Sequence, residues 1–266
     1  MPKEHGIWVV LLTPLFVGSL SSPPAGGAWI GGIALFTMAT LLGVFSLEPL
    51  KLLAKPVVGV SRERIVGWLL IYSALAVAVL LVLMVRRDRW GLAWLAIPAG
   101  LMALSRLWAS AARALRDIRM ELLGVFGLTI TAPSAYYIQH GKLTAEALVI
   151  YLLCAVWFTD RLMAARRTLE RARKRPKLPT AAQRLAWYEK EIVFHAAALF
   201  SAAGVIALSN GRAPWLAFLP FLLATAKNFF DVALAGEPPP PMRIGFLEMS
   251  LGIAFGVAMI AAWRLG

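Results

Sequence analysis

The sequence predicts an all-α, polytopic membrane protein in which about nine transmembrane helices form one domain over residues 1–266. Composition is the first reason: 60% of the residues are apolar, 15% are charged and the mean hydropathy is +0.72. A water-soluble domain of this length could not bury so much apolar surface. The second reason is a succession of apolar windows separated by polar loops. The third is that Lys and Arg concentrate in alternate loops, as in membrane proteins with a fixed orientation.

The first three apolar windows are Ile7–Leu20, Ala28–Leu47 and Ile65–Val85. The Pro- and Gly-rich turn Ser21–Gly27 separates the first from the second. Glu48 directly follows the second window, and Arg64 precedes the third. The first window is short for a bilayer and contains Pro14, so a signal peptide or a re-entrant segment is the alternative to a retained span. Because no small-x-small cleavage site follows it, we favour a retained span.

The next three windows are Gly91–Leu104, Ile118–Ile138 and Leu143–Thr159. The fourth lies between Arg89 and Arg106 and is short, so its full crossing is in question as well. Arg119 lies at the start of the fifth, and Asp160 directly follows the sixth. Cys154, the only cysteine, lies in the sixth window and can form no internal disulfide, so we interpret it as a small packing residue.

The last three windows are Ile192–Leu208, Pro214–Leu234 and Ile244–Trp263. Between the sixth and seventh, residues 161–190 form a basic loop with ten Lys and Arg. This loop is predicted to be cytosolic and to continue the sixth span as a helix. Its arginines make either a solvated helix face or, for some of them, a phosphate-binding surface.

Charge distribution predicts the orientation. With the N-terminus in the cytosol, 20 Lys and Arg lie on the inside and 6 on the outside, while Lys227 lies in a span. The positive-inside rule therefore predicts a bacterial cytoplasmic-membrane protein with its N-terminus inside and its C-terminus outside. The cluster Arg86–Arg89 runs against the rule locally. Although the net charge is +13, the basic residues lie between spans and lack any groove-reading motif, so anionic lipid head groups are expected partners and nucleic acid is not.

Ionisable residues within or at the ends of spans are the candidate functional residues, because each costs a few kcal/mol at bilayer depth unless it is paired or faces a wet cavity. The acidic residues among them gather near the cytosolic half of the predicted spans. This distribution predicts a polar cavity that opens to the cytosol. Two pairs four residues apart share a helix face, Glu191 with His195 and Lys227 with Asp231. The candidate cavity-lining residues are Glu4, His5, Glu121, Glu191, His195, Lys227, Asp231 and Glu248.

A metal centre rich in histidine is not expected, because the chain has three histidines and His140 is predicted outside. Carboxylates would suit Mg²⁺, which prefers oxygen ligands and substrate phosphates.

Three segments carry a resemblance to a known family. The opening Pro2–Trp8 is followed by Leu11–Leu15 and Gly18; the other two segments are Met120–Tyr137 and Arg243–Glu248. In these the chain resembles the YwiC-like family of bacterial membrane proteins over nearly its whole length. The resemblance implies a membrane protein but implies little about its activity.

A more distant resemblance is to the UbiA superfamily of intramembrane prenyltransferases, in which two Asp-rich motifs hold Mg²⁺ on a prenyl diphosphate and basic residues neutralise the leaving diphosphate. Lys55–Ser61 resembles the segment after the first motif, and Glu48 falls about where the last carboxylate of that motif belongs. Asp160 and Arg161 resemble part of the second motif. Each motif keeps one carboxylate, since Leu41 and Val44 occupy positions of the missing aspartates in the first.

This resemblance implies a UbiA-like helical bundle that binds or transfers an isoprenoid lipid diphosphate at the cytosol-facing cavity. Glu48 and Asp160 would contact metal or diphosphate, and Lys55, Arg62 and Arg116 would bind the anion. Enzyme activity stays open, because two or more carboxylates per motif are needed to bridge Mg²⁺ to a diphosphate.

Two other functions stay open. The first is a small-solute transporter, although an odd number of spans and the lack of self-similar halves count against it. The second is a noncatalytic membrane component that packs against a partner protein through Gly-rich faces. Those glycines are Gly31, Gly32, Gly252 and Gly256, and they more often serve internal helix packing.

Overall fold

A computed structural model describes residues 5–22, 29–54, 61–111, 118–174, 180–234 and 240–266. Within these ranges the chain is helical and contains no strand. The elements are α1 (His5–Leu20), α2 (Trp29–Ala54), α3 (Arg62–Arg86), α4 (Gly91–Ala111), α5 (Ile118–Thr129), α6 (Thr131–His140), α7 (Ala145–Lys174), α8 (Ala181–Leu208), the 3-10 turn η1 (Trp215–Phe218), α9 (Leu219–Leu234) and α10 (Pro241–Leu265).

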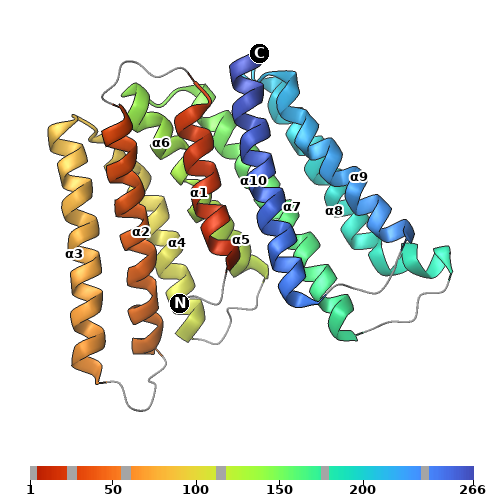
Figure 1. Ribbon diagram of the computed structural model, residues 1–266, viewed down its shortest axis with the longest axis horizontal. Helices are drawn as coiled ribbons and strands as arrows, with labels where there is room; N and C mark the ends of the chain where they lie inside the picture. The colour runs from red at the N-terminus through yellow and green to blue at the C-terminus, as the bar shows by residue number, and fades with distance from the viewer. Residues whose placement is uncertain (1–4, 23–28, 55–60, 112–117, 175–179, 235–239) are drawn as a thin grey trace.

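Every predicted apolar window contains a helix, and successive passes run in opposite directions, with α5 and α6 together making one pass (Figure 1). In the described chain, six helical segments are long and apolar enough to cross a membrane, whereas Trp8–Leu20 and Gly91–Met102 are shorter apolar segments. The structure therefore supports a multi-pass membrane protein. The count of about nine crossings stays a prediction, because two passes are short and a third is broken.

Side-chain exposure agrees with a lipid environment. Large apolar side chains point outward on α3, α4 and α8: Leu70 is 63% exposed, Trp94 is 75% exposed and Phe200 is 74% exposed. So much exposed apolar surface is unfavourable in water but matches the hydrocarbon layer of a bilayer.

The break between α5 and α6 has a local cause. Pro133 has no N–H, so it cannot donate to the carbonyl of Thr129, where α5 ends. The Thr131 hydroxyl donates to the carbonyl of Leu11 in α1 at 2.9 Å and to that of Leu128 at 2.8 Å. The broken pass is thereby fixed against α1. At its far end Gly141, with φ 74°, ends α6 in the left-handed conformation that glycine adopts without strain.

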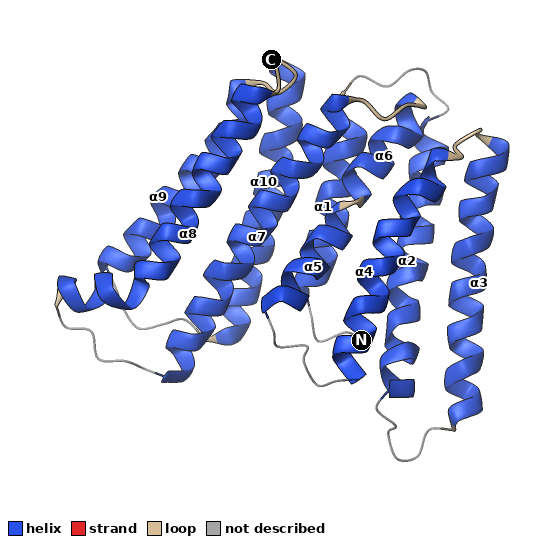
Figure 2. Cartoon of the chain, turned by 180° about the vertical axis from the view of Figure 1, so that it is seen from behind, coloured by secondary structure: helices blue, strands red, loops and turns tan. Residues whose placement is uncertain are grey.

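Two buried clusters share α1 and α6. One contains Leu15, Phe36 and Leu83 and joins α1 and α6 to α2, α3 and α4. The other surrounds α7, where the ring of Trp157 stacks on Phe255 with centroids 4.4 Å apart, and it includes side chains of α8, α9 and α10. Seen from behind, α1 lies between these two sides of the bundle (Figure 2). Leu15 and Val17 are fully buried, the environment expected of a retained span.

The glycines considered as an external packing face instead serve contacts within the chain. A methyl group added to Gly256 would lie 2.6 Å from Thr13, and one added to Gly32 would lie 2.9 Å from Ile138. Gly252 likewise lies against Val9 of α1, so α10 approaches α1 closely.

We call the two ends of the bundle the basic end and the opposite end. The basic end carries the ends of α2 and α7 and the starts of α3, α8 and α10, and it is the end predicted to be cytosolic (Figure 1). At the opposite end, Glu146 of α7 joins several elements. Its carboxylate accepts hydrogen bonds from Ser22 Oγ at 2.6 Å, Tyr136 Oη at 2.9 Å and Trp263 Nε1 at 3.1 Å.

Candidate functional site

A group of polar residues lies buried inside the part of the bundle formed by α7, α8, α9 and α10. We call it the polar cluster; its members are Asp160, Arg161, Glu191, His195, Asn228 and Glu248. Asp160 and Arg161 lie on α7, Glu191 and His195 on α8, Asn228 on α9 and Glu248 on α10. Four helices thus contribute to one site.

The polar cluster lies within the four helical segments, 145–174, 182–208, 215–233 and 242–265, that are long and apolar enough to cross a membrane. At 1.5 Å per residue, Asp160 lies about 22 Å along α7 from its start at the opposite end, and His195 lies about 20 Å along α8 from the same end. Glu248 lies about 25 Å from that end of α10. If a hydrocarbon core about 30 Å thick begins at the opposite end of these helices, the cluster lies in its half nearer the basic end.

His195 is the centre of the cluster. Its Nδ1 contacts Asp160 Oδ1, and its Nε2 lies 3.3 Å from Glu191 Oε1. Both ring nitrogens therefore face carboxylate oxygens, an arrangement that an imidazolium satisfies with two N–H donors. The amide of Asn228 lies beside the same ring, with Nδ2 at 3.2 Å from Nδ1 and 3.0 Å from Nε2. His195 is 2% exposed and Asp160 is 5% exposed, so these contacts are removed from solvent.

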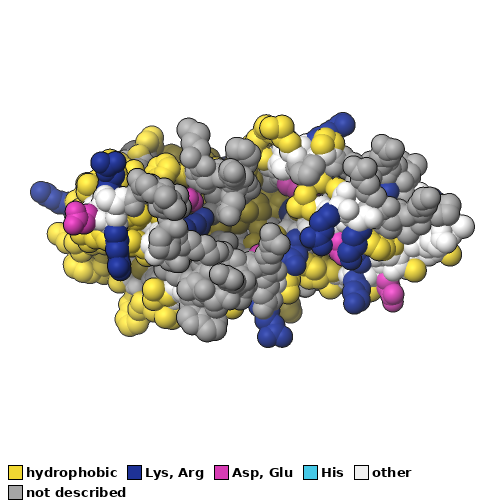
Figure 3. Space-filling view, turned by 90° about the horizontal axis from the view of Figure 1, so that it is seen from below, with side chains coloured by type: hydrophobic (Ala, Val, Ile, Leu, Met, Phe, Trp, Pro, Cys, Tyr) yellow, Lys and Arg dark blue, Asp and Glu magenta, His cyan; other side chains and the backbone are white. Residues whose placement is uncertain are grey.

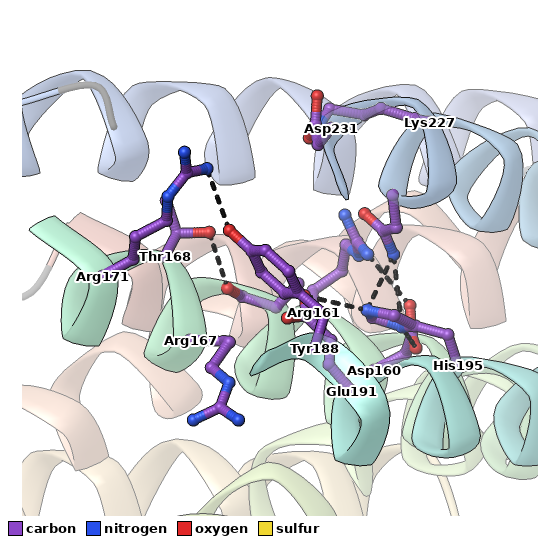
Figure 4. Close-up of polar contacts among 12 residues, drawn as sticks. Asp160, Arg161, Arg167, Thr168, Arg171, Tyr188, Glu191, His195, Lys227 and Asp231 are labelled. Atoms are coloured by element: carbon purple, nitrogen blue, oxygen red, sulfur yellow. Dashed lines mark hydrogen bonds and ion pairs between the residues drawn. The ribbon is translucent and has the colours of Figure 1, made fainter. Parts of the chain in front are cut away.

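Arg161 is the one arginine of the cluster. Its Nη2 donates to Asp160 Oδ2 at 3.0 Å, and its Nη1 lies 3.8 Å from Glu248 Oε1, too far for a hydrogen bond. Figure 4 shows Asp160, Arg161, Glu191 and His195 turned toward one another, with Lys227 and Asp231 apart from them. With His195 protonated, the two cations of the cluster, His195 and Arg161, face three carboxyl groups.

Several buried polar atoms of the cluster have no hydrogen-bond partner in the described part of the chain: Arg161 Nε and Nη1, Glu191 Oε2 and Glu248 Oε2. Buried polar atoms are nearly always hydrogen-bonded, since leaving one unpaired costs about 1–3 kcal/mol. The set contains both donors and acceptors. It could therefore contact a small polar ligand that both donates and accepts, or one that exchanges a proton.

The structure brings four of the residues predicted from sequence into the polar cluster: Asp160, Glu191, His195 and Glu248. Glu191 and His195 share a helix face and are in contact, and Lys227 Nζ lies 2.6 Å from Asp231 Oδ2. Lys227 and Asp231, however, form a partly exposed ion pair outside the polar cluster. Asp160 joins His195 across helices, a contact that spacing alone does not predict.

Other predicted residues lie away from the polar cluster. Glu48 of α2 pairs with Lys51 of its own helix at 3.0 Å, and both side chains are partly exposed. Glu121 of α5 pairs with Arg166 of α7 at 2.6 Å. Arg62 is exposed at the start of α3. Glu4, Lys55 and Arg116 lie outside the described residues, as does the side chain of His5.

Two members of the cluster were not predicted as site residues. Arg161 follows Asp160 directly and was noticed only as part of a motif. Asn228 is uncharged, so it is not among the ionisable residues considered as candidates. Its position beside Lys227 in an apolar window is the feature of the sequence that indicates a polar contact there.

Among the described residues no group of three or more His, Cys, Asp or Glu side chains is arranged to hold a metal ion. In the described part of the chain, no contact joins Glu48 to Asp160. A magnesium site that the two residues would share therefore stays a proposal.

A family model described as YwiC-like protein matches residues 1–136 of the chain. No curated protein and no solved structure matches the chain significantly. The match covers α1 to α5 and the first half of α6, whereas the charged members of the polar cluster all follow it. The UbiA-like arrangement therefore stays a prediction from sequence.

Proposed function

The chain belongs to the YwiC-like family, and from the geometry of the polar cluster we propose that it is a membrane carrier that exchanges protons at this cluster as it moves a small polar solute. His195 carries this proposal, because it lies between two carboxylates from two helices within the apolar layer. Ionisable residues at such depth are costly and mark ion pathways, proton relays and substrate sites.

The cluster also offers a physical link between protonation and movement. Attraction among Asp160, Arg161 and His195 holds α7 to α8, and the longer contact of Arg161 with Glu248 reaches α10. Adding or removing one proton changes the charge that four helices share, and so changes the relative stability of their arrangements. A solute that contacts the unpartnered atoms of Arg161 and Glu191 would bias the same equilibrium.

A pH step tests the proposal directly. When proteoliposomes on a solid-supported membrane are switched from about pH 8 to about pH 6, the range in which histidine titrates, we expect a transient displacement of charge. His195→Gln and Asp160→Asn should reduce this displacement to the level of protein-free liposomes. Glu189→Gln, a change at an exposed acid on α8 outside the cluster, should retain it. If the two cluster variants respond as the unchanged protein does, the proposal is wrong.

A panel of solutes extends the same recording to transport. Amino acids, mono- and dicarboxylates and primary amines are applied one at a time at constant pH. A carrier should give a current with at least one class, again lost in His195→Gln. A displacement on the pH step with no solute response would indicate proton exchange without solute transport.

The second candidate function is binding of an isoprenoid lipid diphosphate. Two observations favour it: the basic end is hollowed near its centre, with hydrophobic side chains deep in the hollow and Lys and Arg on the same face (Figure 3), and Arg161 has buried N–H groups without a partner. A hydrophobic hollow suits an isoprenoid tail, and guanidinium groups suit a diphosphate.

Thermal unfolding separates this candidate from the first. If it holds, farnesyl or geranylgeranyl diphosphate with Mg²⁺ should stabilise the purified protein by about 2.7 kcal/mol at a hundred times the dissociation constant. Glu48→Gln should remove the effect if that carboxylate belongs to the site. Absence of a shift with either lipid, with and without Mg²⁺, would remove this candidate and leave the carrier proposal untouched.

A further inference from the structure

Two helices continue well beyond the length that crosses a bilayer. α7 has 30 residues and α8 has 28, so they are about 45 and 42 Å long, against about 30 Å for the hydrocarbon core. The excess lies at the basic end, because Arg166–Lys174 of α7 and Ala181–Lys190 of α8 are the polar parts of these helices. We call these two segments the basic hairpin.

The basic hairpin is strongly charged. Its two segments contain seven Lys and Arg against two acids, Glu170 and Glu189, which gives a net charge of +5. Glu170 already pairs with Arg167 at 2.7 Å and with Lys174 at 2.6 Å. The acids of the segment therefore neutralise only a small part of its charge. Seen from below, dark blue Lys and Arg side chains gather on this face toward the side where α7 ends (Figure 3).

Aromatic side chains fix the two segments to each other. Arg167 Nη2 donates to the carbonyl of Trp187 at 2.7 Å, and its guanidinium lies 5.2 Å from the centre of the Trp187 ring. Arg171 Nη1 donates to Tyr188 Oη at 2.9 Å. Lys174 Nζ lies 5.7 Å from the Trp187 ring. These contacts hold the cations in a fixed arrangement, so less side-chain entropy is lost when they bind an anion.

The position and chemistry of this surface fit one partner. The basic hairpin begins where the apolar part of α7 ends, at the level of head groups, and tryptophan and tyrosine prefer that level. Arginine forms bidentate hydrogen bonds with phosphate, and juxtamembrane cations gain about 1 kcal/mol each near an anionic leaflet. We propose that the basic hairpin binds the phosphate groups of anionic phospholipids in the leaflet at the basic end.

Thermal unfolding in mixed micelles tests this inference. At equal mole fractions of lipid, phosphatidylglycerol should raise the unfolding temperature by roughly 5–10 °C more than phosphatidylcholine. Concentrated NaCl should reduce the difference, because salt screens exposed charges. Inorganic phosphate at the same concentration should have no comparable effect, and an equal rise would show a site for free phosphate instead of lipid.

Matched variants locate the effect. The triple variant Arg173→Gln, Arg184→Gln, Lys190→Gln should lose most of the response to phosphatidylglycerol. A triple variant with the same change in charge at the opposite end, Arg86→Gln, Lys142→Gln, Arg212→Gln, should keep it. Equal losses in the two would mean that net charge alone is responsible and would overturn the inference. Asp160→Asn should respond as the unchanged protein does; loss of the response there would place the lipid at the polar cluster instead.

Discussion

Asp160→Ala is expected to lower the free energy of unfolding by about 3–5 kcal/mol, because it removes one partner of a buried ion pair and leaves the other charge uncompensated. Arg161 is 4% exposed, and its remaining contact with a carboxylate would be the one to Glu248 at 3.8 Å. His195 would lose its contact through Nδ1 in the same variant. The change is measured by reversible unfolding in mixed micelles with increasing denaturing detergent.

A double variant distinguishes a broken ion pair from a simple loss of packing. Asp160→Ala combined with Arg161→Leu removes both charges, so it should recover a large part of the loss. Glu189→Ala, which truncates an exposed acid on the same helix as His195, should cost no more than about 0.5 kcal/mol. Two results would contradict the desolvated ion pair that the structure indicates. One is a loss of unfolding free energy in Asp160→Ala no larger than in Glu189→Ala. The other is a loss in the double variant equal to the sum of the losses in the two single variants.

The sequence predicted the helical part of the fold well because apolar windows and their charged ends are local properties. It predicted no break in the fifth window, although Pro133 was visible, since whether proline kinks a helix or ends it depends on the helix packed beside it. Here α1 receives the Thr131 hydroxyl and holds the broken pass. The continuation of α7 beyond its apolar window was predicted from the basic run, but the start of α8 at Ala181 was not, because hydropathy finds only the apolar part of a helix.

The site was predicted only in the parts that follow from helical periodicity. Glu191 and His195 are four residues apart, so one turn of helix brings them together. Asp160 meets His195 across two helices, and no spacing in the chain determines that contact. Glu48 pairs with Lys51 of its own helix, and its role in a site stays a prediction. Charged residues within or at the ends of apolar windows were identified as candidate site residues from the sequence. Which of these residues contact one another depends on the packing between α7, α8, α9 and α10.

Gly18→Ala is expected to destabilise the protein by about 1–3 kcal/mol through overpacking where α1 crosses α6. A Cβ atom on Gly18 would lie 2.8 Å from the carbonyl carbon of Ala132 and 2.9 Å from its Cα, closer than side chains normally approach backbone. Because the contact is with backbone, it can be relieved only by moving one helix against the other. Close approach of small residues is a main source of helix association in lipid, so the loss should appear as a lower free energy of unfolding.

Gly43→Ala is the matched control, since it makes the same change inside α2 where nothing lies within 4 Å of the added atom. There alanine should be neutral or should stabilise the helix by up to about 1 kcal/mol, because glycine is the poorer helix former. Opposite signs for the two substitutions would establish that contact with α6, and not helix propensity, makes glycine necessary at position 18. A stabilising or neutral Gly18→Ala would mean that α1 does not lie directly against the backbone of Ala132, and the central position of α1 between the two buried clusters would then be wrong.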